Sequence, residues 1–298
     1  MIKIEISKII SKRRKVYLEV NNESTIGEVR KLYSEMFNIP VERISLKREI
    51  EGNSLEDDVK ISTISNKQLY YQDSNSQFSW KKVFLLQYGG PFIIYPLFYL
   101  RPSFIYGDDF NNPPIELPVK LALLSSLIHY GKKLYETKYV HKFSNETIKH
   151  INLVKKCMYH WGFSALTSYF INHPSFHPPS ITQAYLGFFI FILSEAGNLS
   201  IHLTLRDIHR LGIRTMGIQE PNNNPFLVLF DYVSCPNYTY EICALIGFTI
   251  MTLSFPSALF TFVSFLQMCV WGRQKHRYYL KKFNNYPVDR KSIIPFLL

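Results

Sequence analysis

Long apolar runs after Trp80 constrain the fold of this chain more than any other feature of its sequence. A helix needs about 20 largely apolar residues to cross the hydrocarbon core of a bilayer. The runs are Val83–Leu100, Leu117–Gly131, Cys157–Ile171, Tyr185–Leu205 and Ile242–Trp271. The last run is long enough for two spans, and Pro256 near its middle predicts a tight hairpin. We therefore expect an all-α membrane domain with about six transmembrane helices.

The positive charge of the chain lies mostly in the gaps between these runs. A net charge of +11 is compatible with nucleic-acid binding, contact with anionic lipid, or binding of phosphorylated ligands. Because the basic residues form no continuous stripe, the pattern argues against a nucleic-acid partner and favours membrane lipid. The mean hydropathy of only −0.04 is then an average over a charged N-terminal region and an apolar remainder.

The gaps also predict an orientation. Lys132–Lys156 holds seven lysines against two glutamates, and Arg206–Glu220 holds three arginines. Arg101–Glu116 has one arginine against three acids, and His173–Thr182 has no charged residue. Basic and non-basic gaps alternate, so the positive-inside rule places both termini in the cytosol. The glycosylation patterns that begin at Asn145 and Asn237 would then face the cytosol and stay unmodified.

The first 76 residues read as a separate α+β domain, followed by the membrane domain over residues 77–298. Alternating apolar residues predict strands around Ile2–Ile6 and Val16–Val20. Thr25 and Glu28 form a capping box that starts a helix whose predicted apolar face is Ile26, Val29, Leu32, Tyr33 and Met36. Strands at Ile44–Lys47 and Gln68–Gln72 follow. The order strand, strand, helix, strand, strand resembles the ubiquitin-like β-grasp fold, and the domain could be a docking module or a cytosolic cap.

Polar residues inside the apolar runs mark a candidate site. A charged side chain at the bilayer centre costs about 2.5–3.5 kcal/mol on insertion scales, so it needs an interior role. Glu195, Asn198, His202 and Arg206 recur every three or four residues and share one helix face. A second helix repeats the pattern with Ser125 or Ser126, His129, and Lys132 or Lys133. The two faces predict a cavity open to the cytosol, although hydrogen bonds that only join helices would give the same pattern.

Other kinds of site have weaker signals. The four cysteines form no CxxC pair, and His173 and His177 lie in a proline-broken loop, so we expect no metal. No GxGxxG follows a predicted strand, which excludes a soluble dinucleotide fold. Arginine binds phosphate through its fork of donors. A phosphorylated cofactor could therefore meet the basic residues near the membrane surface, which are Arg206, Arg210, Arg273, Lys275 and Arg277.

An ordered set of short segments over the whole chain resembles the very-long-chain trans-2-enoyl-CoA reductases of the steroid 5-alpha-reductase superfamily. The segments are QFSW (77–80), QYGGP (87–91), HYGKKLYETKYVHKFS (129–144), SCPNYTYE (234–241), KHRYYLKKF (275–283) and IIPFLL (293–298). The resemblance implies a multi-pass protein of the endoplasmic reticulum membrane that reduces a long-chain trans-2-enoyl-CoA with NADPH. That reaction is the last step of fatty-acid elongation, so other elongase subunits are expected partners.

The resemblance also implies roles for individual residues. Tyr238 of the PNY segment is the expected proton or oxyanion donor, with Tyr130 as a second phenol and Lys132 as a supporting cation. The expected NADPH pocket comprises Asn198, His202, Arg206, Asn237, Glu241, His276, Arg277 and Tyr279.

Gln87 departs from the family pattern, which usually has a glutamate before the YxGP run. Glutamine can orient a phenol but cannot supply charge or a proton. A non-catalytic scaffold in an elongase complex therefore stays open. A steroid or polyprenol enone reductase of the same superfamily is a second alternative.

Overall fold

The computed structural model describes residues 2–8, 15–50, 52–73, 77–107, 113–143, 147–210, 224–283 and 286–297. They form two compact units. One unit comprises Met1–Trp80 with Ser144–Leu153, and the other comprises Lys81–Phe143 with Val154–Leu298. Asn145 lies outside the described residues, and so do residues 74–76, which precede the predicted domain boundary between residues 76 and 77.

The N-terminal unit contains a four-stranded mixed sheet and one long helix. Its elements are β1 (Ile2–Lys8), β2 (Lys15–Val20), α1 (Ile26–Phe37), η1 (Val41–Arg43), β3 (Ile44–Lys47), η2 (Ile61–Thr63) and β4 (Gln68–Asp73). The strand order is β2-β1-β4-β3, with β1 parallel to β4 and the other pairs antiparallel. The predicted sequence of strands and helix is confirmed.

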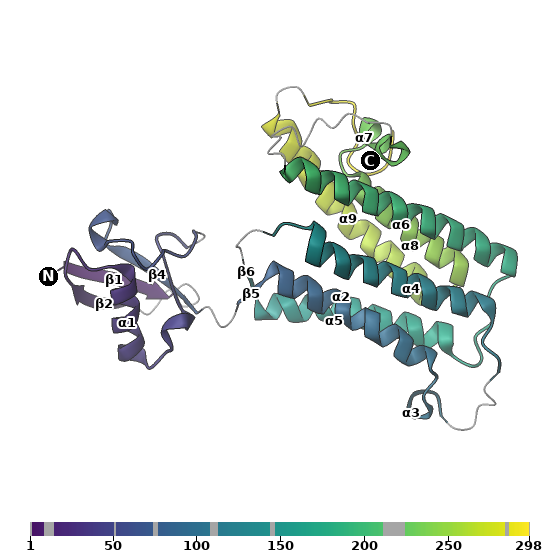
Figure 1. Cartoon of the computed structure of the whole chain (residues 1–298), viewed down its shortest axis with the longest axis horizontal. Coiled ribbons are helices and arrows are strands. Elements are labelled where there is room, and N and C mark those ends of the chain that lie inside the picture. The colour runs from purple at the N-terminus through teal and green to yellow at the C-terminus, as the bar shows by residue number, and fades with distance from the viewer. Residues whose placement is uncertain are drawn as a thin grey trace. The chain divides into compact units, whose positions relative to one another are not determined.

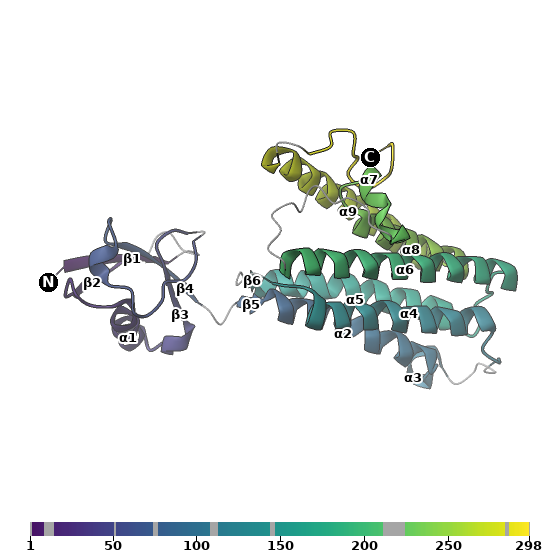
Figure 2. The ribbon, with the colours of Figure 1, turned by 45° about the horizontal axis from the view of Figure 1, so that its top comes forward.

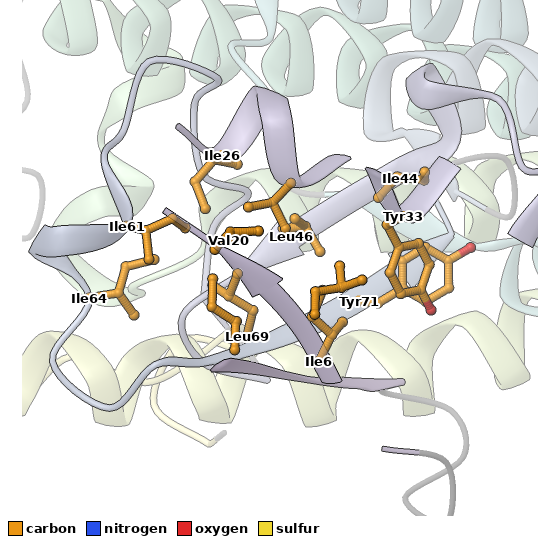
Figure 3. Packing of buried hydrophobic residues seen from close by; sticks show 13 residues of the cluster. Ile6, Val20, Ile26, Tyr33, Ile44, Leu46, Ile61, Ile64, Leu69 and Tyr71 are labelled. Carbon is orange, nitrogen blue, oxygen red and sulfur yellow. The ribbon is translucent and has the colours of Figure 1, made fainter. Parts of the chain in front are cut away.

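Apolar side chains of α1 and the sheet form one core. Ile26 and Tyr33 of α1 face Ile6, Leu69 and Tyr71 of the strands (Figure 3). The Thr25 side chain accepts a hydrogen bond from the Glu28 main-chain N–H, as the capping pattern predicted.

The predicted apolar face of α1 was too wide. Leu32 and Met36 are 42% and 55% exposed, because the sheet covers only the side of the helix that carries Ile26, Val29 and Tyr33. A short ribbon of β5 (Gln77–Ser79) and β6 (Thr147–Lys149) was not predicted, since three-residue strands show no periodicity.

The second unit is helical, and every apolar run predicted as a span lies in a helix. The helices are α2 (Trp80–Tyr99), α3 (Ser103–Tyr106), α4 (Leu117–Tyr135), the π-helix η4 (Glu136–Val140), α5 (His150–Asn172), α6 (Ile181–Arg210), η5 (Pro225–Leu227), α7 (Leu229–Tyr232), α8 (Pro236–Thr252) and α9 (Phe255–Lys282). The helix break predicted near Pro256 is confirmed: α8 ends at Thr252, and Pro256 lies in the first turn of α9.

Two helices among the described residues are long and apolar enough to cross a membrane by themselves, Ile181–Ile208 within α6 and Phe255–Lys282. The structure does not confirm the predicted count of about six spans. Two other helices are too polar or too short to meet the same test of length and apolar composition. Helix α4 carries Lys120, His129, Lys132 and Lys133, and α8 has only 17 residues.

Helix α6 packs against α8 along much of its length, and α9 packs on α8 (Figures 1 and 2). Glycines allow the α6–α8 approach. A Cβ atom at Gly187 would lie 2.4 Å from the Met251 main-chain nitrogen, and one at Gly247 would lie 2.7 Å from that of Phe191. Small residues at helix crossings serve the same purpose in membrane proteins, where backbones can then come close.

We expect Gly187→Ala to destabilise the helical unit by about 1–3 kcal/mol, because the added methyl group forces two backbones apart. Gly162→Ala is the matched control, since a Cβ atom at this helical glycine of α5 would meet no atom within 4 Å. Thermal unfolding in detergent measures both. Equal midpoints for the two variants would contradict the close α6–α8 contact.

Candidate active site

Three helices place a network of buried charged side chains in the interior of the helical unit. His129 Nδ1 of α4 lies 2.6 Å from Glu195 Oε1 of α6, and Lys132 Nζ of α4 lies 2.7 Å from Glu195 Oε2. Lys133 Nζ lies 2.5 Å from Glu241 Oε2 of α8. The two polar stripes predicted on separate helices therefore meet, and α8 adds a third contributor.

The network sets acidic side chains against basic ones. Glu136, Glu195 and Glu241 face Lys132 and Lys133, and His129 lies between the carboxylates of Glu195 and Glu241. Burying ions without partners is costly, so pairing of opposite charges is what allows this set to be buried.

Two asparagines connect the network to the start of α8. Lys132 Nζ donates to Asn198 Oδ1 at 2.5 Å, and Asn198 Nδ2 donates to the Asn237 main-chain carbonyl at 2.8 Å. Asn237 is buried in the first turn of α8. Lys132, Asn198 and Asn237, three residues singled out from the sequence, are thus in direct contact.

A π-helix at the end of α4 forms the next layer of the site. The wide turn of η4 brings Glu136 and His141 near each other, and His141 Nε2 lies 3.3 Å from His202 Nδ1 of α6. Burial, together with Lys133 and Lys132, lowers the pKa of His141 to about 4, so this imidazole is neutral at physiological pH. Such π-turns are frequent at functional sites.

Glu136, His141 and His202 also have the spacing of a metal site within the part of the chain that is described. One potential ligand atom from each lies within 4.8 Å of the other two. Lys132 Nζ lies 3.7 Å from Glu136 Oε1. The absence of a metal remains a prediction.

A narrow cavity of about 50 Å³ opens beside the network. Tyr130, buried and with its ring 4.9 Å from that of His129, lies on its wall. The remaining wall is mostly aromatic and hydroxyl side chains, including Tyr95, Ser126, Phe163, Ser164 and Phe260.

Gln87 does not contact a tyrosine hydroxyl in the described structure. Its buried side-chain Nε2 lies 2.7 Å from His160 Nε2 of α5. His160 was not singled out from the sequence, because a single histidine in an apolar run carries no spacing signal.

Tyr238 lies on α8 three residues before Glu241. Its ring packs with Cys235, Ile242, Met268 and Ile293, on the side toward α9. Asn237 meets the network through its main-chain carbonyl, and Glu241, one helical turn later, meets it through its side chain.

The other predicted cofactor residues lie apart from the network. His276 Nδ1 is 2.6 Å from Ser234 Oγ, which also accepts from Tyr286 Oη, and Tyr279 packs against Tyr286. Arg277 is exposed, and Arg206 Nε donates to Asp207 at 2.8 Å. The side chain of Arg210 lies outside the described residues.

Comparison with known proteins identifies the family. A probable very-long-chain enoyl-CoA reductase of Caenorhabditis elegans is 45% identical over 94% of this chain and 93% of that protein. The chain belongs to the very-long-chain enoyl-CoA reductase family. The very-long-chain enoyl-CoA reductase of Dictyostelium discoideum is 38% identical over 98% of this chain and 99% of its own length. A trans-2,3-enoyl-CoA reductase-like protein of Mus musculus is 39% identical, over 94% of this chain and 79% of its own.

The family model described as 3-oxo-5-alpha-steroid 4-dehydrogenase matches residues 146–298. That region contains α6, α8 and α9, and therefore Glu195, Asn198, Asn237 and Glu241. The family resemblance inferred from the short segments is confirmed.

Removing one partner of a buried ion pair costs about 3–5 kcal/mol, because the other charge is left uncompensated. We therefore expect Lys133→Met to lower the thermal midpoint strongly, and Lys133→Met combined with Glu241→Gln to recover most of that loss. Lys120→Met, an exposed lysine on α4, is the control. Additive losses in the double variant would show that the two side chains do not pair.

Proposed function

We propose that this chain reduces long-chain trans-2-enoyl-CoA to saturated acyl-CoA with NADPH, the last step of the fatty-acid elongation cycle. Relatives named as enoyl-CoA reductases support this over 94% and 98% of the chain. The single structural observation that carries the proposal is that α4 and α6 bring Lys132, Glu195 and Asn198 into contact beside the cavity that holds Tyr130.

The residues present fit a nicotinamide cofactor. Both carboxylate oxygens of buried Glu136 lack a hydrogen-bond partner among the described residues, and a ribose or carboxamide donor would satisfy them. Asn198, Asn237 and Glu241 offer further polar groups, and His202 lies one layer nearer the cytosolic end of α6. Arg206, at that end, would hold a phosphate. We assign His276, Arg277 and Tyr279 of α9 to the same cofactor, at its outer side.

A bound reduced nicotinamide supplies a hydride, which adds to the β-carbon of the enoyl group. The residues of the chain must then stabilise negative charge on the thioester oxygen and deliver a proton to the α-carbon. Tyr130 lies on the cavity wall and is suited to this role, and Lys132 lies within the same polar cluster. Tyr238 would act from the α9 side.

The membrane arrangement extends the proposal. We infer that α2, α4, α5, α6, α8 and α9 all cross the endoplasmic reticulum membrane, with both termini in the cytosol. The alternation of basic and non-basic gaps supports this orientation. We assign the N-terminal unit to the ubiquitin-like β-grasp class, which its β2-β1-β4-β3 order with a parallel central pair supports. Other elongase subunits are the proposed partners.

The purified chain in nanodiscs should oxidise NADPH when given a long trans-2-enoyl-CoA, followed by loss of NADPH absorbance. We expect Tyr130→Phe and Tyr238→Phe each to lower kcat by about 10²–10⁴-fold, the usual contribution of a positioned proton donor. Tyr185→Phe, on an exposed position of α6, is the control. Full turnover of Tyr238→Phe would remove that residue from the proton-donor role.

Preference for NADPH over NADH tests the phosphate assignment. We expect Arg206→Ala and Arg277→Ala to raise the KM for NADPH by about 10- to 100-fold, the range of a lost charged hydrogen bond, and to leave the KM for NADH unchanged. Arg48→Ala, in the N-terminal unit, is the control. Equal use of both cofactors by the unmodified chain would contradict the assignment.

A further inference from the structure

Gln87 of α2 and His160 of α5 form a polar pair in which each side chain has one buried atom without a hydrogen-bond partner among the described residues. Gln87 Nε2 lies 2.7 Å from His160 Nε2, while Gln87 Oε1 and His160 Nδ1 have no hydrogen-bond partner among the described residues. Buried polar groups are nearly always satisfied, and each exception calls for an explanation. A ligand that brings its own polar atom would explain this one.

The packing of α2 on α5 fixes the pair. The Trp161 indole N–H donates to the Leu86 carbonyl at 3.1 Å, and a Cβ atom at Gly90 would clash with the same indole. These contacts align Leu86 with Trp161, and therefore Gln87 with His160. Pro91 has no main-chain N–H to donate to the carbonyl of Gln87 one turn earlier, so that carbonyl lacks its usual helical hydrogen bond.

The hydrogen bond determines which nitrogen of His160 can donate. Since the amide of Gln87 donates to Nε2, a neutral imidazole carries its proton on Nδ1. The free atom of His160 is then an N–H donor inside the helical unit. Glutamine, unlike glutamate, leaves the pair without formal charge. The Nδ1–H of His160 can therefore donate to a neutral carbonyl, and the pair needs no counter-ion.

The pair lies next to the cavity that holds Tyr130. Phe163 and Ser164, one turn after His160 on α5, line that cavity. Phe260 of α9 also lines it, and its ring is 6.3 Å from the ring of His160. The His160 ring therefore lies against Phe260, a residue of the cavity wall.

We propose that His160 Nδ1–H donates a hydrogen bond to the thioester oxygen of the bound enoyl-CoA, as a catalytic residue, and that Gln87 acts as a positioning residue that sets the tautomer of His160. This rests on the proposed function. A fixed donor in a water-poor site stabilises the charge that builds on this oxygen when the β-carbon accepts a hydride. The Tyr130 hydroxyl, on the cavity wall, would be the second donor to that oxygen. In this chain the neutral Gln87–His160 pair then serves at the position where the family usually has a glutamate.

The first test compares kcat and KM of the unmodified chain, His160→Phe, His160→Asn and Gln87→Leu in nanodiscs. Losing one donor to a developing oxyanion costs about 10²–10³-fold in kcat. We expect that loss in His160→Phe with little change in the KM for NADPH, a loss in Gln87→Leu, and partial recovery in His160→Asn, whose amide N–H replaces Nδ1–H. His150→Phe, at the exposed first residue of α5, is the matched control, and thermal midpoints report folding.

The second test does not need turnover. Infrared difference spectra of trans-2-enoyl-CoA labelled with ¹³C at the thioester carbonyl, bound without NADPH, report hydrogen bonding to that oxygen. We expect a lower carbonyl stretching frequency in the unmodified chain and His160→Asn than in His160→Phe. If the unmodified chain fails to reduce the substrate, the proposed function falls, and the spectra still decide the role of His160. Unchanged kcat in folded His160→Phe, or equal stretching frequencies in all variants, overturns the inference.

Discussion

The pairing of buried charges between α4, α6 and α8 is the interaction on which the rest of the helical unit depends. In a medium of low dielectric constant an unpaired ion is costly, so these helices must rotate until His129, Lys132 and Lys133 meet Glu195 and Glu241. That rotation turns Asn198 toward Asn237 and places Tyr130 on the cavity wall. The apolar faces of the same helices are then left for neighbouring helices or lipid.

Close packing makes this pairing possible. Near one end of the α6–α8 crossing, Gly187 and Gly247 let the two backbones nearly touch, and farther along α6 the Tyr240 ring covers Gly197. Asn198 follows directly and reaches the main chain of α8. The close packing that the glycines allow therefore brings α6 and α8 near enough for the hydrogen bond between Asn198 and the Asn237 carbonyl. A glycine has the same effect between α2 and α5. Gly90 leaves room for the Trp161 ring, and the close packing brings Gln87 to His160.

The parts of the site that were predictable from the sequence are those in which one helix carries a repeated signal. The spacing of Glu195, Asn198, His202 and Arg206 placed them on one face, and charges in an apolar run pointed inward. The partner of Gln87 could not be found this way, because His160 lies on another helix and no periodicity links them. The apolar face of α1 was drawn too wide for a related reason: helix spacing shows which residues share a face, but not how far the sheet extends over it.

The sequence by itself determined the strands and helix of the N-terminal unit, the positions of the long helices, the helix break at Pro256 and the family, because each depends on local periodicity, turn chemistry or an ordered set of short segments. Only the tertiary structure decided which polar side chains meet. It joined Lys133 to Glu241, turned Tyr238 toward α9, separated His276 and Tyr279 from the charged network, and paired Gln87 with His160. The physical reason is that the rotation and spacing of packed helices depend on contacts between residues far apart in the chain, which local patterns do not record.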